Sequence, residues 1–377
     1  MPINFDQIPT PCYVLDEHLL RNNLAVIKKV KEGAGVDILV SLKAFAGWGV
    51  FPIFKEYGFG ASASSLNEAR LAFEELGVKV HTYAPAYQER HIGDILKYSS
   101  HISFNSISQL NKYGKMADQQ GVSLGLRVNP EFSETAYEIY NPCKSGSRLG
   151  VTTRQLGDGM PQEIEGLHFH TLFEADSRAL ERVLAVFVKK FGAFLPQLKW
   201  VNMGGGHLIT GKDYDIEHLI KILIDFKRAH DLEIVLEPGS AFTYETGYLV
   251  STILDIVENG GVKTAILDVS FTCHMPDCLE MPYKPVIVGA GDAEAGKPTY
   301  RMGGVSCMAG DYMGDWTFDK ELSPGDKIIF EDMIHYTMVK TTMFNGVDHP
   351  SVGIWGERSG FRLLREFSHQ DYKNRLS

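Results

Sequence analysis

Lys43 follows an apolar run, residues 38–42 (ILVSL), that is typical of a buried parallel strand. Such strands rarely end in a lysine. One explanation is structural, because a strand-end lysine commonly lays its methylenes along apolar surface and sends its charge to water. The other is chemical, since a lysine on a rigid strand in a water-poor site becomes a neutral nucleophile more easily. The residue alone leaves both explanations open.

Gly204, Gly205 and Gly206 follow a second strand-like run, residues 200–203 (WVNM). Glycines let backbone amides approach an anion without an intervening side chain, and late-strand loops are the usual phosphate site of a TIM barrel. A simple turn is the alternative. The run is not a dinucleotide fingerprint, because the G-x-G-x-x-G pattern is absent and no acidic residue follows at the required distance.

A lysine combined with a phosphate-binding loop suits pyridoxal 5′-phosphate, whose aldehyde forms a Schiff base with a lysine. Glu237 ends another strand-like run and would lie against the pyridine nitrogen, where a carboxylate keeps that nitrogen protonated. His170 would stack on the cofactor ring, with His168 on the same side of its strand, and Arg127 would support the site through hydrogen bonds. The structural alternatives are a loop or capping carboxylate, satisfied core histidines and a buried ion pair.

Eight short β-like runs alternate with helix-like segments in the first two thirds of the chain, which predicts repeated βα units around parallel strands. The strand-like runs are residues 37–42, 58–62, 79–83, 101–104, 123–128, 165–170, 200–203 and 233–237. The clearest helical patterns are residues 65–77, 89–98, 106–121, 177–195 and 215–231. The sequence therefore predicts an α/β fold with a (β/α)8 TIM barrel, and an open doubly wound sheet is the alternative.

The polar residues at the strand ends distinguish these two architectures, because a TIM barrel carries its chemistry at the C-terminal ends of its strands. The predicted strands end in Lys43, Ser62, Tyr83, Asn105, Arg127, His170, Gly204 to Gly206 and Glu237. In a barrel all of these would point into one cavity at its mouth. This pattern favours the barrel.

The sequence changes in character after residue 242 and predicts a second, all-β domain over residues 243–377. Its β-like segments, separated by glycine and proline turns, are residues 247–258, 262–271, 284–290, 326–333 and 335–344. The strand-like residues 11–16 have no helix before them, so we expect the segment 1–16 to join this domain. The cofactor-binding barrel then occupies residues 17–242.

With 377 residues, the chain exceeds the usual size of a single hydrophobic core. Its net charge of -10 argues against a nucleic-acid partner and favours a cationic one. The first residues lack the basic start and apolar stretch of a signal peptide, and no segment has the unbroken apolar length of a membrane span. We therefore expect a cytoplasmic protein without a membrane partner.

The five cysteines are scattered along the chain, which indicates neither a disulfide framework nor a zinc site. Cys273 and Cys278 bracket His274 and Asp277, but Cys-x4-Cys with one histidine is a weak metal pattern. We expect no metal ion in this protein.

In order and spacing, these motifs resemble the fold type III pyridoxal-phosphate decarboxylases, the family of ornithine, arginine and diaminopimelate decarboxylases, with alanine racemase as a distant relative. The resemblance covers nearly the whole chain. It rests on SLKAF (Lys43), GFGASASSLNE (Glu68), LRVNP (Arg127), GLHFH (His170), MGGG (Gly204 to Gly206), EPG (Glu237), GGVSCMAGD (Cys307 and Asp311) and EDMIHYTMVKTTMFNG (Tyr336). The forms GLHFHTLFE, EPGSAF and SCMAGD are most similar to the carboxynorspermidine decarboxylases, a branch that also accepts carboxyspermidine and makes norspermidine and spermidine.

The resemblance implies a decarboxylase that binds pyridoxal phosphate through Lys43 and acts as a homodimer, in which the β-domain of one subunit completes the barrel site of the other. Glu68 is a further cofactor-site residue on this basis. Cys307 would face the substrate α-carbon and help return a proton, with His170 as another catalytic residue. Tyr336 would bind the cofactor phosphate.

The substrate side departs from the family pattern. Ser240 replaces the arginine that follows Glu-Pro-Gly in ornithine decarboxylase, Met308 replaces an acid after the family cysteine, and the acid that many relatives carry near Ser62 is missing. Asp277 and Glu280 lie in the loop where relatives hold the distal substrate group, and two acids there suit the cationic end of a carboxylated polyamine. Solvent-facing loop acids are the alternative. The candidate substrate-binding residues are Asp277, Glu280, Ser240 and Asp311.

Three other functions remain open at this point. A racemase would use the same barrel and lysine, but alanine racemase has an arginine against the pyridine nitrogen, so Glu237 favours decarboxylation. A decarboxylase of ornithine, lysine or diaminopimelate is the second. The third is a non-catalytic homologue that binds the cofactor, against which the joint presence of Lys43, Glu237 and Cys307 argues.

Overall fold

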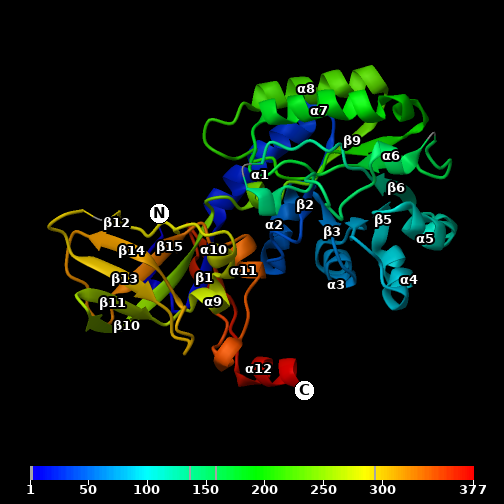
Figure 1. Ribbon diagram of the computed structural model, residues 1–377. Coiled ribbons are helices and arrows are strands. Elements are labelled where there is room, and N and C mark those ends of the chain that lie inside the picture. The colour runs from blue at the N-terminus through cyan, green and yellow to red at the C-terminus, as the bar shows by residue number, and fades with distance from the viewer. Residues whose placement is uncertain (1–2, 136, 158, 293) are drawn as a thin grey trace. The chain divides into compact units, whose positions relative to one another are not determined.

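A computed structural model describes residues 3–135, 137–157, 159–292 and 294–377. The chain forms two compact units (Figure 1). One extends from Asn23 to Phe242, and the other combines the segment up to Asn22 with Thr243–Ser377. Each unit is described separately below.

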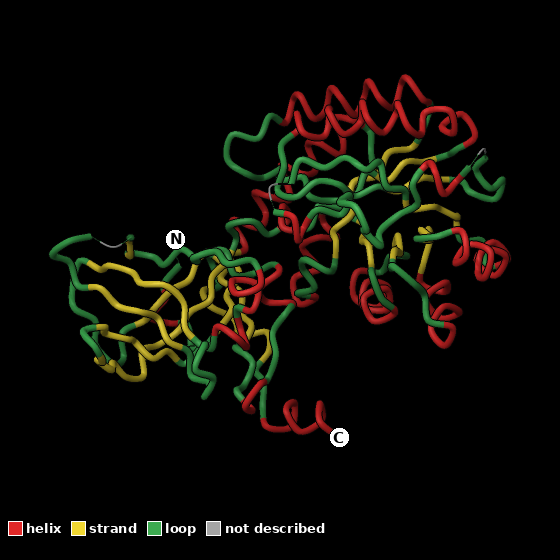
Figure 2. The backbone as a smooth tube through the Cα atoms, in the orientation of Figure 1, coloured by secondary structure: helices red, strands yellow, loops and turns green. Residues whose placement is uncertain are grey.

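The first unit is a closed barrel of eight parallel strands, so the prediction of a TIM barrel is confirmed (Figures 1 and 2). The strands are β2 (Asp37–Ser41), β3 (Gly60–Ala63), β4 (Val80–Tyr83), β5 (Ser99–Phe104), β6 (Ser123–Arg127), β7 (Gly166–His168), β8 (Trp200–Asn202) and β9 (Glu233–Leu236). Asp37 pairs with Val235, which joins the first strand to the last and closes the barrel. Each of the eight predicted runs overlaps one of these strands, although β3 ends one residue after its run and β5 begins two residues before its run.

Helices alternate with the strands and lie on the outside of the barrel, as the sequence pattern predicted (Figure 2). They are α1 (Glu17–Ala34), α2 (Phe51–Glu56), α3 (Leu66–Leu71), α4 (Glu89–Tyr98), α5 (Ile107–Gln119), α6 (Thr153–Leu156), α7 (Ser177–Phe191) and α8 (Ile216–His230). Three of them, α1, α2 and α6, were not among the predicted segments. The five predicted segments contain α3, α4, α5, α7 and α8.

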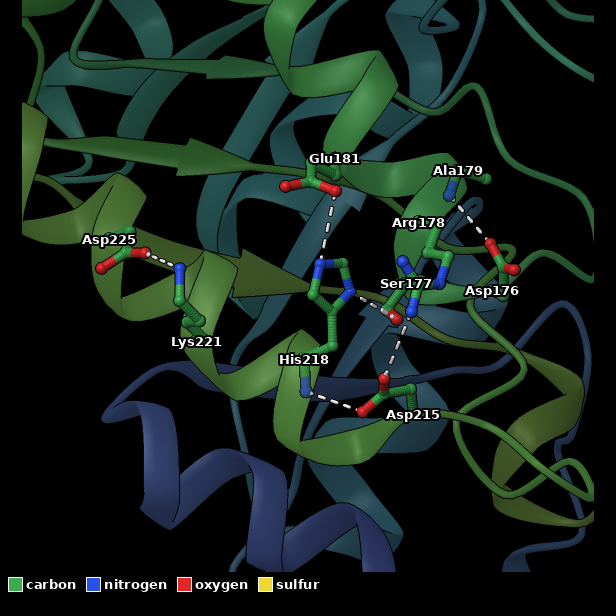
Figure 3. A network of polar contacts seen from close by, with 9 residues as sticks. All are labelled: Asp176, Ser177, Arg178, Ala179, Glu181, Asp215, His218, Lys221 and Asp225. Carbon is green, nitrogen blue, oxygen red and sulfur yellow. Dashed lines mark hydrogen bonds and ion pairs between the residues drawn. The ribbon is translucent and has the colours of Figure 1, made fainter.

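A polar network fixes the start of α7 beside α8 (Figure 3). Asp176 caps α7 by accepting the backbone N–H of Ala179 at 2.8 Å, and Asp215 caps α8 through the N–H of His218 at 2.9 Å. The His218 ring then connects the two helices, because Nδ1 lies 2.9 Å from the Ser177 hydroxyl. These capping acids explain why both helices begin where they do.

The N-terminal half of the barrel interior is filled by one large aromatic residue and a pair of histidines. A Cβ on Gly125 would come within 2.3 Å of the Trp200 ring, and one on Gly166 within 2.0 Å, so both positions must lack a side chain. The rings of His81 and His101 stack with centroids 3.8 Å apart and both meet the edge of Trp200. This end of the barrel is a packed core.

The second unit is built on a nine-stranded mixed sheet. Its strands are β1 (Cys12–Asp16), β10 (Gly247–Asn259), β11 (Val262–Leu267), β12 (Ala290–Gly291), β13 (Thr299–Gly303), β14 (Tyr312–Phe318), β15 (Lys327–Glu331), β16 (Ser351–Gly356) and β17 (Gly360–Arg365). The N-terminal strand β1 pairs antiparallel with β10 and parallel with β16, which makes it part of this sheet. Ile8, Cys12, Val14, Val250 and Trp355 form a core cluster around it.

The sheet unit contains more helix than the sequence pattern indicated. Its helices are α9 (Phe271–His274), α10 (Pro276–Glu280), α11 (Tyr336–Val339) and α12 (His369–Leu376). The prediction of a β-like segment at residues 335–344 is wrong, because this stretch starts with α11 and continues as turns. Most of residues 284–290 is also irregular, and pairing there is limited to short contacts such as the bridge between Ile287 and Phe330.

Across the described ranges, no helix has the length and apolar character needed to cross a membrane. In the same ranges, no group of three or more His, Cys, Asp or Glu residues is arranged to hold a metal ion.

Candidate active site at the barrel mouth

A cavity of about 550 Å³ opens at the C-terminal ends of the barrel strands. Seven of the eight strand-end positions contribute to its wall, namely Lys43, Ser62, Tyr83, Arg127, His170, Gly205 and Glu237. Asn105 is the exception, although its Oδ1 accepts a hydrogen bond from the Tyr83 hydroxyl at 2.8 Å. The barrel thus collects side chains that are up to about 200 positions apart in the sequence, as its geometry requires.

Lys43 lies in a turn immediately after β2, and the backbone on either side of it is fixed. The Leu42 N–H donates to the Ser62 carbonyl at 3.1 Å, and the Ala44 N–H donates to the Ser41 carbonyl at 3.0 Å. The lysine side chain is accessible inside the cavity, yet barrel atoms surround it. Burial and the neighbouring Arg127 lower its pKa, against the opposing effect of Glu237 and Glu68. A neutral, nucleophilic amine is therefore easier to reach here than in water.

Glu237 directly follows β9 and is half-buried in the cavity wall. Its Oε1 accepts a hydrogen bond from Nδ2 of Asn202 at 2.6 Å. Burial raises the pKa of this carboxyl, while hydrogen bonds from Asn202 and Ser62 and the nearby Lys43 and Arg127 oppose the rise. A carboxyl balanced in this way can exchange a proton with a neighbouring base. Asn202 was not identified from the sequence, although it lies two residues before Gly204 on the same strand face.

The glycine run after β8 comes so close to neighbouring backbone that no side chain would fit. A Cβ would lie 2.4 Å from the Phe169 carbonyl oxygen at Gly204, 2.3 Å from that of Glu237 at Gly205 and 2.1 Å from that of Leu172 at Gly206. Gly204 and Gly206 also have φ of +69° and +87°. The Gly204 amide donates to Asn202 Oδ1 and that of Gly205 to His170 Nδ1, so two of the three amides are bound inside the site.

His170 lies between the lysine strand and the glycine loop. Its Nδ1 is 3.0 Å from the Gly205 nitrogen and 3.1 Å from the Gly205 oxygen, so this loop fixes the plane of the ring. Burial, Lys43 and Arg127 lower the pKa of His170 well below its ordinary value, and the ring is neutral at neutral pH. His168, two residues earlier, meets the edge of the Tyr83 ring at 5.3 Å.

Arg127 is a buried cation at the end of β6. Its guanidinium lies over the Tyr83 ring, 4.4 Å from the centroid, and burial lowers its pKa. Asn105 connects this pair to the loop that follows β6: its Nδ2 donates to the Arg148 carbonyl and its Oδ1 accepts the Gly150 N–H, both at 2.8 Å. Residues 139–142, 144 and 146–149 of that loop line much of the cavity. None of these loop residues was predicted from the sequence to line the site, although the length of the loop was a signal for such a role.

Glu68 lies in the first turn of α3 rather than on the cavity wall. Its Oε2 accepts the Ser64 N–H at 2.6 Å, and its backbone N–H donates to the capping hydroxyl of Ser65 at 3.2 Å. Burial raises the pKa of Glu68, while the Ser64 amide and Lys43 oppose that rise. Glu68 therefore supports the Lys43 environment electrostatically.

The cavity wall is predominantly cationic. Four of its residues are lysine or arginine, namely Lys43, Arg127, Lys144 and Arg148, and Lys144 pairs with Glu138 at 3.7 Å. Among the described residues that line the cavity, Glu237 is the only carboxylate. The barrel cavity therefore suits anionic groups such as a phosphate or a carboxylate and offers little to bind a distant ammonium.

Cys307 and Asp311 belong to one loop of the sheet unit. Cys307 is exposed, and its N–H and S–H both donate to Asn345 Oδ1 at 3.2 Å. The Asp311 carboxylate is buried and accepts the backbone N–H groups of Thr272 and Ser306, at 3.1 and 3.0 Å. Asp311 thus shapes the loop that carries Cys307.

Asp277 uses only one of its two carboxylate oxygens in hydrogen bonds among the described residues. Its Oδ2 accepts from the hydroxyls of Tyr283 and Thr337, each at 2.8 Å. Its Oδ1 is buried and meets no donor among the residues that the structure describes. Glu280 is exposed and forms an ion pair with Lys340. Of the two predicted acids, Asp277 is therefore the better prepared for a ligand.

The two remaining predicted residues occupy short helical turns. Tyr336 begins α11 in the sheet unit, and Ser240 begins the 3₁₀ turn Ser240–Phe242 after β9 in the barrel unit. Ser240 is half-buried and is not part of the cavity wall.

The residues at the barrel mouth fit pyridoxal phosphate. The donor set consists of an accessible lysine with a lowered pKa, a carboxyl and an imidazole, held in a cationic cavity beside a backbone loop that admits no side chain. This set can bind an aldehyde, a ring nitrogen and a phosphate.

Comparison with known proteins agrees with this geometry. The family model for the pyridoxal-dependent decarboxylase, C-terminal sheet domain, matches residues 12–334. The chain is 48% identical over 370 residues to carboxyaminopropylagmatine decarboxylase of Synechocystis, covering 98% of this chain and 96% of the relative. It is 43% identical over 382 residues to carboxynorspermidine/carboxyspermidine decarboxylase of Campylobacter jejuni, covering 98% and 99%. The crystal structure of carboxynorspermidine decarboxylase from Campylobacter jejuni in complex with norspermidine is similar at a TM-score of 0.91 and 42% identity, covering 98% of this chain and all of that one.

Proposed function

The chain belongs to the pyridoxal-dependent decarboxylases, and from this premise we propose that it decarboxylates carboxynorspermidine and carboxyspermidine to norspermidine and spermidine. It is an enzyme whose cofactor is pyridoxal 5′-phosphate. The observation that carries the proposal is the meeting of Lys43, Glu237 and the glycine loop around one cationic cavity. The similarity to a solved structure that contains norspermidine supports the substrate class.

Each barrel residue has a role that follows from its environment. Pyridoxal phosphate, when bound, supplies an electron sink for the electron pair that a departing carboxylate leaves on the α-carbon. Lys43 provides the amine that holds the cofactor aldehyde, aided by its lowered pKa. Glu237, whose pKa is raised by burial, would hold a proton at the pyridine nitrogen. The ring of His170, fixed by Gly205, would pack against the cofactor ring.

The proton that replaces the lost carboxylate comes from Cys307. Its thiol is exposed, and a hydrogen bond to Asn345 Oδ1 keeps the S–H oriented. An amide oxygen accepts but cannot donate, so the Cys307 S–H is the donor in this contact. Asp311 acts indirectly by holding the loop, and Tyr336 is proposed to bind the phosphate.

The two ends of the substrate differ in charge. The α-carboxylate suits the cationic barrel cavity. The distal ammonium requires a second acid, because Glu237, the only carboxylate among the described residues of the cavity wall, is assigned to the ring nitrogen. Asp277 is proposed for that role because its buried Oδ1 has no hydrogen-bond partner among the described residues. Glu280, already paired with Lys340, and Ser240 are secondary candidates.

Carboxyaminopropylagmatine is the second candidate substrate, because the Synechocystis decarboxylase of that name is 48% identical to this chain. An agmatine end carries a planar guanidinium, which pairs best with both oxygens of a carboxylate. Asp277 offers only one free oxygen, since Tyr283 and Thr337 occupy the other. This geometry favours the single ammonium of carboxynorspermidine and carboxyspermidine.

One assay tests the proposal. Carbon dioxide release by the purified enzyme is measured with carboxynorspermidine, carboxyspermidine, carboxyaminopropylagmatine, ornithine, lysine and diaminopimelate. We expect the highest kcat/KM for the first two substrates. A preference for carboxyaminopropylagmatine would establish the second candidate, and a preference for ornithine or diaminopimelate would contradict the whole substrate class. Racemisation of an amino acid without carbon dioxide release would identify a racemase.

We also propose that the active enzyme is a homodimer with shared sites, in which Lys43 and Cys307 of one site come from different subunits. A mixture of Lys43→Ala and Cys307→Ala proteins, each inactive alone, should regain about a quarter of wild-type activity after refolding together, because half of the dimers then carry one intact site. No recovery in mixed dimers would place both residues in the same subunit. A cytoplasmic location remains a prediction, which cell fractionation tests.

A further inference from the structure

We propose that Asn202 is a positioning residue that holds the Glu237 carboxylate and the Gly204 turn together as one hydrogen-bonded unit, so that the ring-nitrogen end and the phosphate end of the cofactor site are set by a single side chain. This inference rests on the proposed function, because it concerns residues proposed to bind pyridoxal phosphate. Asn202 ends β8 and is 1% exposed.

The geometry is a closed circuit of three hydrogen bonds. Asn202 Nδ2 donates to Glu237 Oε1 at 2.6 Å, and Asn202 Oδ1 accepts the Gly204 N–H at 2.8 Å. The Glu237 backbone N–H donates to the Gly204 carbonyl at 2.7 Å and completes the loop. Displacing any of the three residues therefore displaces the other two.

The orientation of the Asn202 amide is determined by its neighbours. One side faces a carboxylate, which accepts only, and the other faces a backbone N–H, which donates only. A flipped amide would place oxygen against oxygen and N–H against N–H. As a consequence, the unprotonated form of Oε1 of Glu237 is favoured as the better acceptor, and a proton on this carboxyl is favoured at Oε2.

Substitution by aspartate separates the two halves of this role. An Asn202→Asp side chain still accepts the Gly204 N–H, but it faces Glu237 with a second carboxyl group. Two carboxyls at this distance stay together only while they share a proton, as in other buried carboxyl pairs. When the shared proton is lost at higher pH, the two groups repel one another, and the Gly204 turn moves with them.

The test measures cofactor binding rather than turnover. Apoprotein is titrated with pyridoxal phosphate between pH 5.5 and 9, and the dissociation constant is obtained from the quenching of tryptophan fluorescence. The dissociation constant of each variant is then divided by that of wild type at the same pH. Asn202→Ala should weaken binding on the order of 10- to 100-fold at every pH, as expected for losing hydrogen bonds to a charged group. Asn202→Asp should bind within about threefold of wild type at low pH and weaken progressively as the pH rises.

A swapped pair gives the decisive comparison. In the double variant Asn202→Asp/Glu237→Gln, an amide again faces a single carboxylate, so the pH dependence introduced by Asn202→Asp should disappear. Asn129→Asp is the matched control, because Asn129 is also buried and accepts a backbone N–H, that of Glu131 at 2.7 Å, while its Nδ2 faces the Pro142 carbonyl. The dissociation constant of Asn129→Asp for pyridoxal phosphate should show the same pH dependence as that of wild type.

The inference is overturned if Asn202→Asp follows the wild-type pH dependence, or if that dependence persists in the swapped pair. Loss of thermal stability without any change in the dissociation constant would also overturn it, since Asn202 would then be purely structural. If Asn202→Ala does not fold, the pH dependence of cofactor binding in Asn202→Asp and in the swapped pair still tests the inference. A chain that shows the expected binding pattern but releases no carbon dioxide from any carboxylated polyamine would refute the proposed function and leave this inference standing.

Discussion

The two ends of the barrel interior are supplied by the same strands and yet differ in nearly every property. On β8, Trp200 fills the N-terminal half, whereas Asn202 reaches Glu237 at the mouth. On β7, Gly166 only makes room for Trp200, whereas His168 lines the cavity. One end is packed and the other is hollow and charged. Along one strand, the N-terminal inward-facing residue thus serves packing, and the next inward-facing residue serves the chemistry of the site.

This difference has a physical reason. At the packed end, polar groups are satisfied by each other: Trp200 Nε1 donates to the Ser123 hydroxyl at 2.9 Å, which donates to Glu165 at 2.6 Å. At the mouth, the cations Lys43 and Arg127 share one carboxylate on the cavity wall among the described residues. A surplus of charge is costly without a ligand, and it becomes useful when an anionic cofactor binds. Substitutions at the two ends should therefore separate activity from stability.

Of the three substitutions that compare the two ends, Glu237→Gln at the mouth should have the largest effect. The amide cannot hold a proton at the pyridine nitrogen as a carboxylate does, so kcat should fall about 100- to 1,000-fold. The free energy of unfolding of the apoprotein should change little or rise, because a carboxyl whose pKa is raised by burial is replaced by a neutral group. Steady-state kinetics and urea denaturation measure the two quantities. An unchanged kcat would refute the role of Glu237.

The opposite pattern is expected from Trp200→Ala at the packed end. Gly125 and Gly166 cannot fill the vacated space, so the substitution leaves a cavity and should cost about 3–5 kcal/mol of unfolding free energy. In the fraction that stays folded at low temperature, kcat should remain within about threefold of wild type. Urea denaturation and single-temperature kinetics check this. A loss of activity greater than the loss of folded protein would mean that the two ends are coupled.

A smaller, pH-dependent effect is expected from the stacked histidines at the packed end. Burial lowers the pKa of His81 and of His101, with a further contribution to His81 from His101, while Glu165 and Asp37 oppose the shift at His101. Because the folded-state pKa lies below the unfolded value of about 6.5, the unfolded chain binds more protons as the pH falls. Stability from this pair should be constant above that value and decrease below it.

The slope should reach at most about 1.4 kcal/mol per pH unit for each histidine. His168 and His170 have lowered pKa values too, so the informative quantity is the difference between wild type and His81→Asn in urea midpoint from pH 7.5 to pH 5. A smaller loss of stability in the variant on acidification would agree with the account. Identical slopes would show that the stacked pair does not contribute.

The sequence predicted the barrel well because two simple regularities coincide in it. Buried parallel strands form short apolar runs, and their C-terminal ends meet at one face, so polar residues at the run ends converge. These two regularities were sufficient to place Lys43, Arg127, His170 and Glu237 at the barrel mouth. The roles of these residues remain predictions, since position alone does not establish chemistry.

Other features depend on contacts that are distant in sequence. A polar residue inside a strand, such as Asn202, has the same local pattern whether it packs, binds water or holds a carboxylate, and only its two partners distinguish these cases. The segment 335–344 is rich in β-branched and aromatic residues, which favours strand. Its helix α11 is instead anchored by the Thr337 hydroxyl, which donates to Asp277, sixty positions away. Tertiary contacts of this kind override local propensity.

The central claim is that Lys43, at the end of an ordinary apolar strand, carries the cofactor covalently. The most direct test is to reduce the purified holoenzyme with borohydride, digest it and locate the cofactor-labelled lysine by mass spectrometry. The account predicts a single labelled peptide, with the label on Lys43, and none from Lys43→Ala. A label on another lysine, or an equal yield of labelled peptide from Lys43→Ala, would contradict it.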